Sequence, residues 1–250
     1  MINDETKRKL REMAMDPFIK ALENQEVGGD TYFVMSFDER LNLAVDECYT
    51  QKHVERAKRL IQGAKFRYPN ADVNTMYYEN RSINRNEILT LANCSYILKN
   101  TNLIINGYTG CGKTHLACAL GKEACRRLYR VRYFRMPELL EMLNIAVQTG
   151  YNLSKTVKKL ANYDLLIIDE WLADNPSDQE VKYLLEIFEK RYDTRPTIFC
   201  TQRKVSDWHI RLGGGIMADA ILDRIVHNSI TIDTGETNMR EFLAAHPALA

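Results

Sequence analysis

The sequence predicts an α/β protein in which a mostly parallel sheet follows a small all-helical domain. Up to about residue 75 the apolar residues recur only at helical spacing. Beyond that point short β-branched runs alternate with helical patterns, the order typical of a parallel sheet with crossover helices. A glycine-rich loop, residues 107–114, joins the first of these runs to the next helical pattern. We therefore expect two domains, residues 1–75 and 76–250.

The first domain has clear helix boundaries. Asp16 followed by proline predicts an N-cap, and a pair of glycines ends that helix. Ser36 and Glu39 have the spacing of a capping box, and apolar residues continue at helical spacing to about Ala64. The segment 68–72, which contains a proline, breaks the pattern. Helices alone therefore account for this part of the chain.

The second domain alternates strands and helices. The expected strands are residues 102–106, 131–134, 165–168, 197–201 and 230–232. The helical patterns between them cover residues 114–128, 137–148, 154–162, 178–192 and 217–226. This alternation implies crossover helices and a mostly parallel sheet.

The composition excludes several classes of protein. Hydrophobic residues make up 45% and charged residues 27% of the chain, which is typical of a globular protein with an ample core. No apolar run approaches the roughly 20 residues of a membrane span, and the charged start is unlike a secretory signal. The six cysteines lack C-x-x-C spacing, so neither zinc nor a disulfide framework is indicated. We expect a cytoplasmic protein, and the net charge of +1 means that any basic surface is local.

The loop after the first strand is the strongest functional signal. It satisfies G-x-x-x-x-G-K-[ST], and its glycines and the following helix N-terminus would form a phosphate cradle. Lys113 would reach the β- and γ-phosphates, and the Thr114 hydroxyl would ligate Mg²⁺. The expected nucleotide contacts of this loop are Gly107, Tyr108, Thr109, Gly110, Cys111, Gly112, Lys113 and Thr114. An ordinary glycine turn is the alternative, and the flanking strand and helix argue against it.

Two further strands end in polar side chains. Asp169 and Glu170 follow an apolar run, at the end of a strand where open α/β sheets bind ligands. Asp169 would hold Mg²⁺ through its water shell, and Glu170 would orient and deprotonate the water that attacks the γ-phosphate. The strand 197–201 could place Thr201 or Gln202 near the same phosphate. In both cases the alternative is a strand that simply ends in a satisfied polar turn.

Taken together, several blocks of sequence resemble one family. The blocks cover residues 10–13, 37–41, 65–71, 107–120, 164–171, 184–192 and 218–228. They are similar to the IstB-like ATPases, transposon-encoded helpers of the AAA+ class that are related to the DnaC helicase loader and the DnaA initiator. The resemblance covers nearly the whole chain, and the continuation through His115 and the last block are specific to this family. It adds His115 to the residues expected to bind the nucleotide.

The resemblance implies an AAA+ core with a five-stranded parallel sheet and ATP-driven oligomerisation on DNA, with delivery of target DNA to a partner transposase. Arg224 matches the arginine that completes the ATP site of a neighbouring subunit. Arg240 matches a second family arginine, for which we expect γ-phosphate sensing in cis. The family often has two aspartates where this chain has Asp169 and Glu170, which makes hydrolysis here more conventional. Little sequence follows Arg240, so we expect the helical lid of AAA+ modules to be absent or rudimentary.

Two basic regions are candidates for DNA. The first is a helical stripe formed by Lys52, Arg56 and Arg59, for which a solvated helix face is the alternative. The second lies between the second and third strands, where the resemblance implies a lining of the DNA channel. Its basic residues are Lys155, Lys158 and Lys159, and a plain surface helix is the alternative. The arginines interleaved with aromatics at 126–135 fall at an edge strand, where charges commonly block edge-to-edge pairing.

Three functions from different classes remain open. The leading hypothesis is a DNA-binding ATPase without marked sequence preference that recruits a transposase. A helicase loader would have a replicative helicase as its partner, and the first 75 residues, which look IstB-like, argue for the former. A P-loop kinase would be a monomer with a phosphate-acceptor pocket and no need for Arg224.

Overall fold

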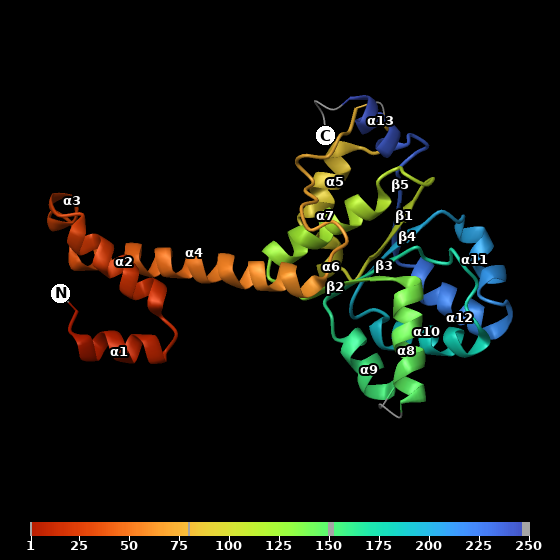
Figure 1. Ribbon diagram of the computed structural model, residues 1–250, viewed down its shortest axis with the longest axis horizontal. Coiled ribbons are helices and arrows are strands. Elements are labelled where there is room, and N and C mark those ends of the chain that lie inside the picture. Colours follow the sequence, from red (N-terminus) through yellow and green to blue (C-terminus); the bar gives the residue numbers. More distant parts are fainter. Residues whose placement is uncertain (1, 80, 150–152, 247–250) are drawn as a thin grey trace. The chain divides into compact units, whose positions relative to one another are not determined.

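The computed structural model describes residues 2–79, 81–149 and 153–246 (Figure 1). The chain forms two compact units, Met1–Arg59 and Leu60–Ala250. Among the described residues, none of the helices combines the length and the apolar character that crossing a membrane requires.

The first unit is helical. It contains α1 (Asp4–Glu12), α2 (Asp16–Val27), α3 (Asp30–Phe33) and most of α4 (Phe37–Ala64). The capping box before α4 is confirmed: the Ser36 N–H donates to Glu39 Oε2 at 2.7 Å, and the Glu39 N–H donates to Ser36 Oγ at 3.3 Å. The N-cap role expected of Asp16 is wrong by one position, because Met15 is the cap residue. Asp16 instead lies in the first turn, where the helix dipole favours an anion.

The second unit is built on a five-stranded parallel sheet. Its strands are β1 (Asn102–Asn106), β2 (Val131–Arg135), β3 (Leu165–Asp169), β4 (Thr197–Thr201) and β5 (Ser229–Asp233). The spatial order is β2-β3-β4-β1-β5, and every neighbouring pair is parallel. All five expected strands are confirmed to within one residue at each end. The two central strands β3 and β4 are buried at every position, as expected of apolar runs in a parallel sheet. β2 lies at an edge, as expected.

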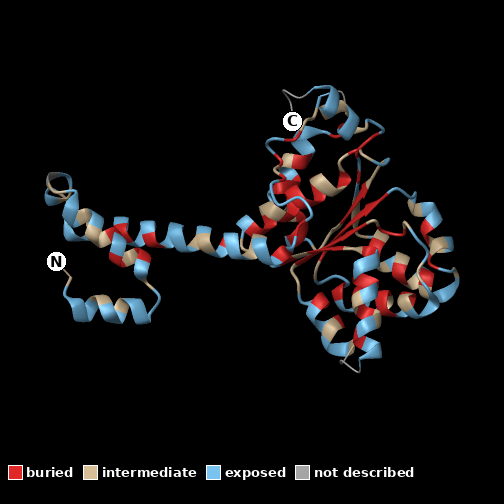
Figure 2. Ribbon diagram, viewed as in Figure 1, coloured by how far each residue is buried: buried red, intermediate tan, exposed pale blue. Residues whose placement is uncertain are grey.

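The sheet is covered on both faces. The helices of this unit are α5 (Arg85–Ala92), α6 (Ser95–Leu98), α7 (Lys113–Arg126), α8 (Met136–Gln148), α9 (Leu153–Ala161), α10 (Asp178–Arg191), α11 (Val205–Arg211), α12 (Gly215–Val226) and α13 (Met239–Ala245). Successive strand residues alternate between two cores, so that Leu103 and Ile105 pack with α5 and α7, and Ile104 packs with α8, α10 and α12 (Figure 2). Strands β3 and β4 are buried along their whole length and form the centre of the unit.

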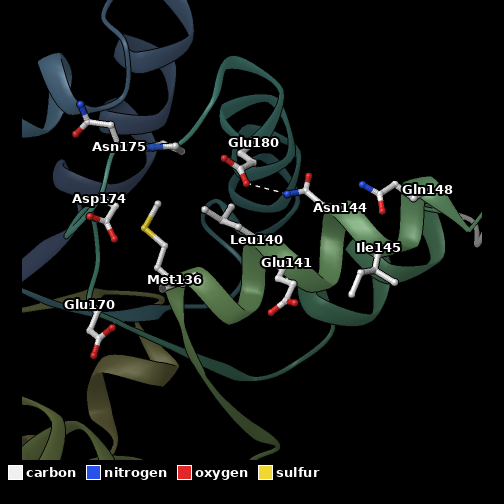
Figure 3. Close-up of a pocket in the computed structure, with 12 residues that line it drawn as sticks. Met136, Leu140, Glu141, Asn144, Ile145, Gln148, Glu170, Asp174, Asn175 and Glu180 are labelled. Carbon is white, nitrogen blue, oxygen red and sulfur yellow. Dashed lines mark hydrogen bonds between the residues drawn. The ribbon is translucent and has the colours of Figure 1, made fainter.

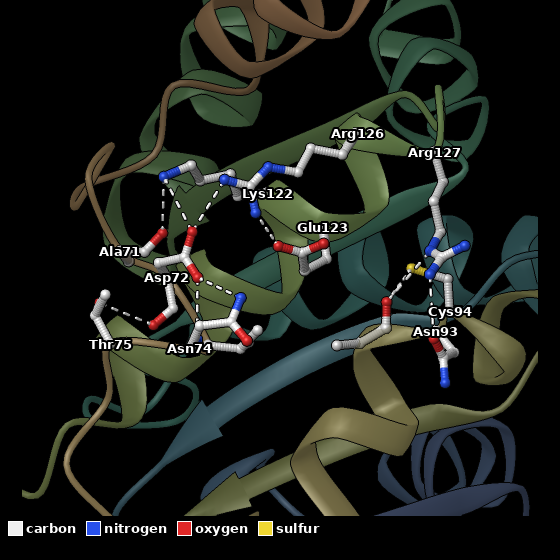
Figure 4. Close-up of polar contacts among 12 residues, drawn as sticks. Ala71, Asp72, Asn74, Thr75, Asn93, Cys94, Lys122, Glu123, Arg126 and Arg127 are labelled. Atoms are coloured by element: carbon white, nitrogen blue, oxygen red, sulfur yellow. Dashed lines mark hydrogen bonds and ion pairs between the residues drawn. The ribbon is translucent and has the colours of Figure 1, made fainter.

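The segment that precedes the sheet is fastened to α7. Ala71 and Val73 are buried in the same core as the strands. Asp72 accepts a hydrogen bond from Arg126 Nη2 at 2.9 Å and lies 4.0 Å from Lys122 Nζ, while the Asn74 N–H donates to the same carboxylate at 3.0 Å (Figure 4). These contacts hold the segment beside the helix that follows the glycine-rich loop.

Candidate functional site

The loop between β1 and α7 requires its glycines. Gly107, Gly110 and Gly112 have φ values of 148°, 86° and 82°, a region that side chains with a Cβ rarely adopt. A Cβ on Gly107 would lie 2.1 Å from the Thr234 hydroxyl oxygen, and one on Gly110 would lie 2.2 Å from Asn238 Oδ1. The loop therefore combines an unusual backbone with close approach of the segment after β5.

Lys113 is held inside this loop. Its Nζ donates to the carbonyl oxygens of Gly107 and Tyr108, each at 2.7 Å. Burial lowers the pKa of Lys113, and the nearby Arg240 acts in the same direction. A phosphate oxygen is a stronger partner for an ammonium group than a neutral carbonyl is. The lysine is thus placed where the sequence predicts a phosphate contact.

Thr114 and Asp169 meet at the carboxyl end of β3. The Thr114 hydroxyl donates to Asp169 Oδ2 at 2.8 Å, and the Tyr133 hydroxyl donates to the same oxygen at 2.8 Å. The Asp169 side chain is buried, and its charge adds to the effect of burial in raising the pKa of Tyr133. A hydroxyl and a carboxylate oxygen this close are the hard ligands that Mg²⁺ takes together with several waters. The residues present therefore fit the expected ion.

Glu170 has partners that sequence reasoning missed. Arg135 Nη2 lies 2.7 Å from its Oε2, and Arg67 Nη1 lies 3.5 Å from its Oε1. We call these two arginines the Glu170 clamp. Glu170 itself has φ +57°, so the backbone departs from the extended conformation of β3 at this residue. Each carboxylate oxygen accepts one of these N–H groups and keeps a second lone pair, so the two arginines restrain the position of the Glu170 carboxylate.

A cavity of about 490 Å³ opens beside Glu170 (Figure 3). It lies along α8 and is lined by Met136, Leu140 and Asp174 among others. Glu170 lies at one end of this cavity, so its carboxyl group is reachable from the surface.

Gln202 reaches the glycine-rich loop, and Thr201 does not. The Thr109 hydroxyl donates to Gln202 Oε1 at 2.9 Å, which ties the end of β4 to the loop. Thr201 is buried, and its hydroxyl donates to the carbonyl oxygen of Trp171 at 3.0 Å. Of the two candidates at this strand end, Gln202 is the one beside the phosphate loop.

A second cavity, of about 530 Å³, adjoins the other side of the loop. His115 and Arg240 line it, together with the apolar side chains of Met76, Met239 and Leu243. The Met239 N–H donates to the Gly110 carbonyl oxygen at 3.0 Å, so α13 is attached directly to the loop. Burial lowers the pKa of His115, which keeps its ring neutral at pH 7. Apolar walls next to phosphate-binding groups suit a nucleoside.

The helix α13 is the last element among the described residues. It is a short helix, Met239–Ala245.

Arg224 lies away from these groups. Its backbone carbonyl oxygen accepts a hydrogen bond of 3.4 Å from the Asn102 side chain, at the start of β1, whereas the glycine-rich loop follows the end of that strand. Its guanidinium group forms an ion pair with Glu189 and donates to the Ala220 carbonyl oxygen at 2.8 Å. The structure therefore brings together the loop, Asp169 and the groups around it, and leaves Arg224 at the opposite end of the sheet.

The two basic regions differ in their neighbours. One region consists of three exposed lysines of α9, which we call the α9 lysines: Lys155, Lys158 and Lys159. Lys155 and Lys159 line a cavity of about 390 Å³ with Arg132 and Phe134, and no carboxylate lines it among the described residues. The second is the α4 stripe, made of Lys52, Arg56 and Arg59. The α4 stripe borders a groove that Asp16 and Glu55 also line, and Arg59 lies 3.9 Å from Glu55. The positive charge of the α4 stripe is thus partly neutralised by Glu55.

A phosphate loop after β1, an acidic pair after β3 and this strand order define a P-loop nucleotide-binding protein of the AAA+ class. The family model described as IstB-like ATP binding protein matches residues 8–243, and the chain belongs to this family. The resemblance found in the sequence is therefore confirmed.

Two ATP-binding proteins of insertion sequences are similar to this chain. An insertion sequence ATP-binding protein of Sinorhizobium fredii is 35% identical over 90% of this chain and 88% of its own length. A second such protein, from Pseudomonas fluorescens, is 35% identical over 81% of this chain and 87% of its own.

Two solved structures share the fold. The DnaC helicase loader matches 66% of this chain and 98% of its own, with a TM-score of 0.55 and 24% identity. The replication initiator DnaA bound to AMPPCP and single-stranded DNA matches 72% of this chain and 56% of its own, with a TM-score of 0.59 and 20% identity. At these identities the two structures support the fold alone.

Proposed function

We propose that this protein hydrolyses ATP to ADP and phosphate with Mg²⁺ as cofactor. The observation that carries the proposal is the contact between Thr114 and Asp169, which joins the phosphate loop to the acidic strand end at 2.8 Å. Lys113 would exchange its two carbonyl partners for phosphate oxygens, and Gln202 would lie beside the γ-phosphate. Bound Mg²⁺ would neutralise the phosphate charge.

In this proposal Glu170 acts as the general base that activates the attacking water. Release from the Glu170 clamp would free an oxygen to accept the proton of the attacking water. Arg240 lines the cavity at the loop and would sense the nucleotide in cis, while Arg224 would act on the nucleotide of a neighbouring subunit. ATP sites at subunit interfaces imply a homo-oligomer.

DNA is the proposed macromolecular ligand, bound largely without regard to sequence. The α9 lysines support this, because exposed ammonium groups close to Arg132 attract phosphates rather than base edges. The α4 stripe is the second candidate, since Asp16 and Glu55 partly neutralise it.

A partner transposase is the proposed recipient of the DNA. The relatives at 35% identity are ATP-binding proteins of insertion sequences, which supports a role in transposition. We propose that the helical region of residues 1–75 makes partner and oligomer contacts. A helicase loader is the second candidate, favoured by the DnaC-like fold, and its partner would be a replicative helicase.

Two variants separate binding from hydrolysis. Lys113→Ala should abolish ATP binding, because it removes the cation inside the loop, whereas Glu170→Gln should bind ATP and lose turnover by at least about 10²-fold. Lys182→Ala and Glu186→Gln, at exposed positions of α10, are matched controls that should leave both properties unchanged. Equal loss of ATP binding in the Lys113 and Glu170 variants would contradict the role given to Glu170.

A size measurement tests the wider proposal. Gel filtration with and without an ATP analogue and DNA should show assembly that needs both ligands. A monomer under all conditions would instead favour a P-loop kinase, which has no need of Arg224.

A further inference from the structure

Arg81 is a half-buried cation that none of the roles above uses. Its Nη1 donates to the Tyr77 carbonyl oxygen at 3.0 Å, and its Nη2 donates to the carbonyl oxygen of Cys111 in the phosphate loop. These bonds use two of the five guanidinium N–H groups. Its Nε is buried without a hydrogen-bond partner among the described residues. Arg81 thus retains unused donors at the edge of the phosphate loop.

No described carboxylate balances this charge. Arg81 forms no ion pair within the described part of the chain, and neither an aspartate nor a glutamate lines the 530 Å³ cavity that it borders. Burial lowers the pKa of Arg81, so the folded protein holds the charged form at a cost. A buried guanidinium without an anion is a group that gains from an anionic ligand.

The position of Arg81 singles out one phosphate. The cavity is lined by Gly110, by residues 112–115 and by apolar side chains suited to a base. Arg240 also lines it, whereas Asp169, Glu170 and Gln202 do not. A Cβ on Gly112 would lie 3.5 Å from Arg81 Nη2, which places the guanidinium at the start of α7. Arg81 therefore lies on the nucleoside side of the loop, where the phosphate attached to the ribose belongs.

We propose that Arg81 binds the α-phosphate of the nucleotide and so contributes equally to the affinity for ATP and for ADP. The proposal rests on the nucleotide site proposed above. Arg81 would keep at least one of its carbonyl contacts and donate unused N–H groups to a non-bridging α-oxygen. The residue then binds substrate and product alike, unlike groups that contact only the γ-phosphate.

The test measures the affinity for ADP and for the two diastereomers of ADP that carry a sulfur atom on the α-phosphate. Binding is measured with the full chain and without metal. Sulfur in place of the oxygen that Arg81 contacts weakens a charge-assisted hydrogen bond, so the wild-type protein should distinguish the two diastereomers several-fold. Arg81→Ala should lower ADP affinity about 10- to 100-fold and bring the ratio between the diastereomers close to one. The fall in ATP affinity should match the fall for ADP.

Two controls separate a phosphate contact from a structural tie. Arg85→Ala removes an exposed arginine on α5 and should leave both affinity and ratio unchanged. Arg81→Lys keeps a charge but not the fork that reaches two carbonyls, so it should retain part of the diastereomer preference. It also serves as the readout if the alanine variant does not fold.

Three results would overturn the proposal. An Arg81→Ala protein that keeps the wild-type ratio between diastereomers, even at lower affinity, would show that Arg81 only braces the loop. A loss confined to ATP would place Arg81 at the γ-phosphate. A wild-type protein that binds neither ADP nor ATP would overturn the proposed function together with this inference, whereas the first two results leave the function intact.

Discussion

Arg224 should contact the ATP bound by a neighbouring subunit, because the ATP bound by its own subunit is too far away. The carbonyl oxygen of Arg224 contacts Asn102 at the start of β1, and the phosphate loop begins after Asn106. Four strand steps of about 3.3 Å separate these two residues by about 13 Å, before any distance along the loop is added. An extended arginine side chain covers only about 7 Å. A contact in cis would therefore require the sheet to come apart.

A mixture of two inactive variants tests whether Arg224 acts on the nucleotide of a neighbouring subunit. Arg224→Ala and Glu170→Gln should each bind ATP and hydrolyse it poorly, since an arginine from a neighbour is worth about 10³–10⁵ in rate in other NTPases. In an equimolar mixture, an interface is active when the Arg224 variant supplies the ATP site and the Glu170 variant supplies the arginine. Random head-to-tail assembly makes roughly a quarter of the interfaces active, so about a quarter of the wild-type rate should return.

The assay is phosphate release from the mixture on DNA, with co-assembly verified by gel filtration. Glu189→Gln is the matched control, because it breaks the ion pair of Arg224 but leaves the guanidinium group. That variant should hydrolyse ATP and should also complement Glu170→Gln. If a co-assembled mixture stays inactive, Arg224 acts in cis or only supports the fold. If Glu189→Gln is as inactive as Arg224→Ala, the ion pair itself is what matters.

Three other results should follow from the structure. Arg135→Ala removes the shorter contact of the Glu170 clamp and should raise ATP turnover measured without DNA; a fall would show that the clamp does not restrain Glu170. Alanine at all three α9 lysines should lower the slope of log K against log[salt] by about 0.9 for each DNA phosphate that the protein no longer neutralises, and an unchanged slope would shift the DNA site to the α4 stripe. The Asn74 N–H and then Arg126 hold the pKa of Asp72 below its usual value, so its stabilising effect is complete above about pH 4 and disappears as the pH falls through the folded-state pKa. Asp72→Asn should therefore cost about 1 kcal/mol in urea unfolding at pH 7 and almost nothing near pH 2, whereas an equal cost at both would mean that the carboxylate charge is not involved.

Local sequence patterns predicted the strands and the phosphate loop. They did not predict contacts between residues that are far apart in the chain. The strands are continuous apolar runs, and the phosphate loop is a contiguous motif, so both are legible within a short window of sequence. Short elements such as α6 and α11 were not predicted, because four to seven residues carry too little periodicity.

The contacts of Glu170 are an example of what the sequence patterns did not predict. Arg67 and Arg135 are far from it in the chain, and only the pairing of β2 with β3 brings Arg135 level with Asp169, next to Glu170. Arg81 was likewise not predicted, since its position at the loop depends on how the segment before the sheet packs on α7. The sequence motifs therefore indicated the candidate site residues themselves, and they did not indicate the arginines that contact Glu170 and the phosphate loop.

The bonds from Lys113 to the carbonyls of Gly107 and Tyr108 bear on how fast a nucleotide arrives. They hold the loop backbone around the ammonium group, and phosphate oxygens would take the place of the two carbonyl oxygens as its partners. A loop already shaped in this way loses little conformational entropy on binding, and little rearrangement separates encounter from capture. Nucleotide association should then proceed in one kinetic phase whose rate rises linearly with concentration. Differences between ATP and ADP would arise in how long each remains bound.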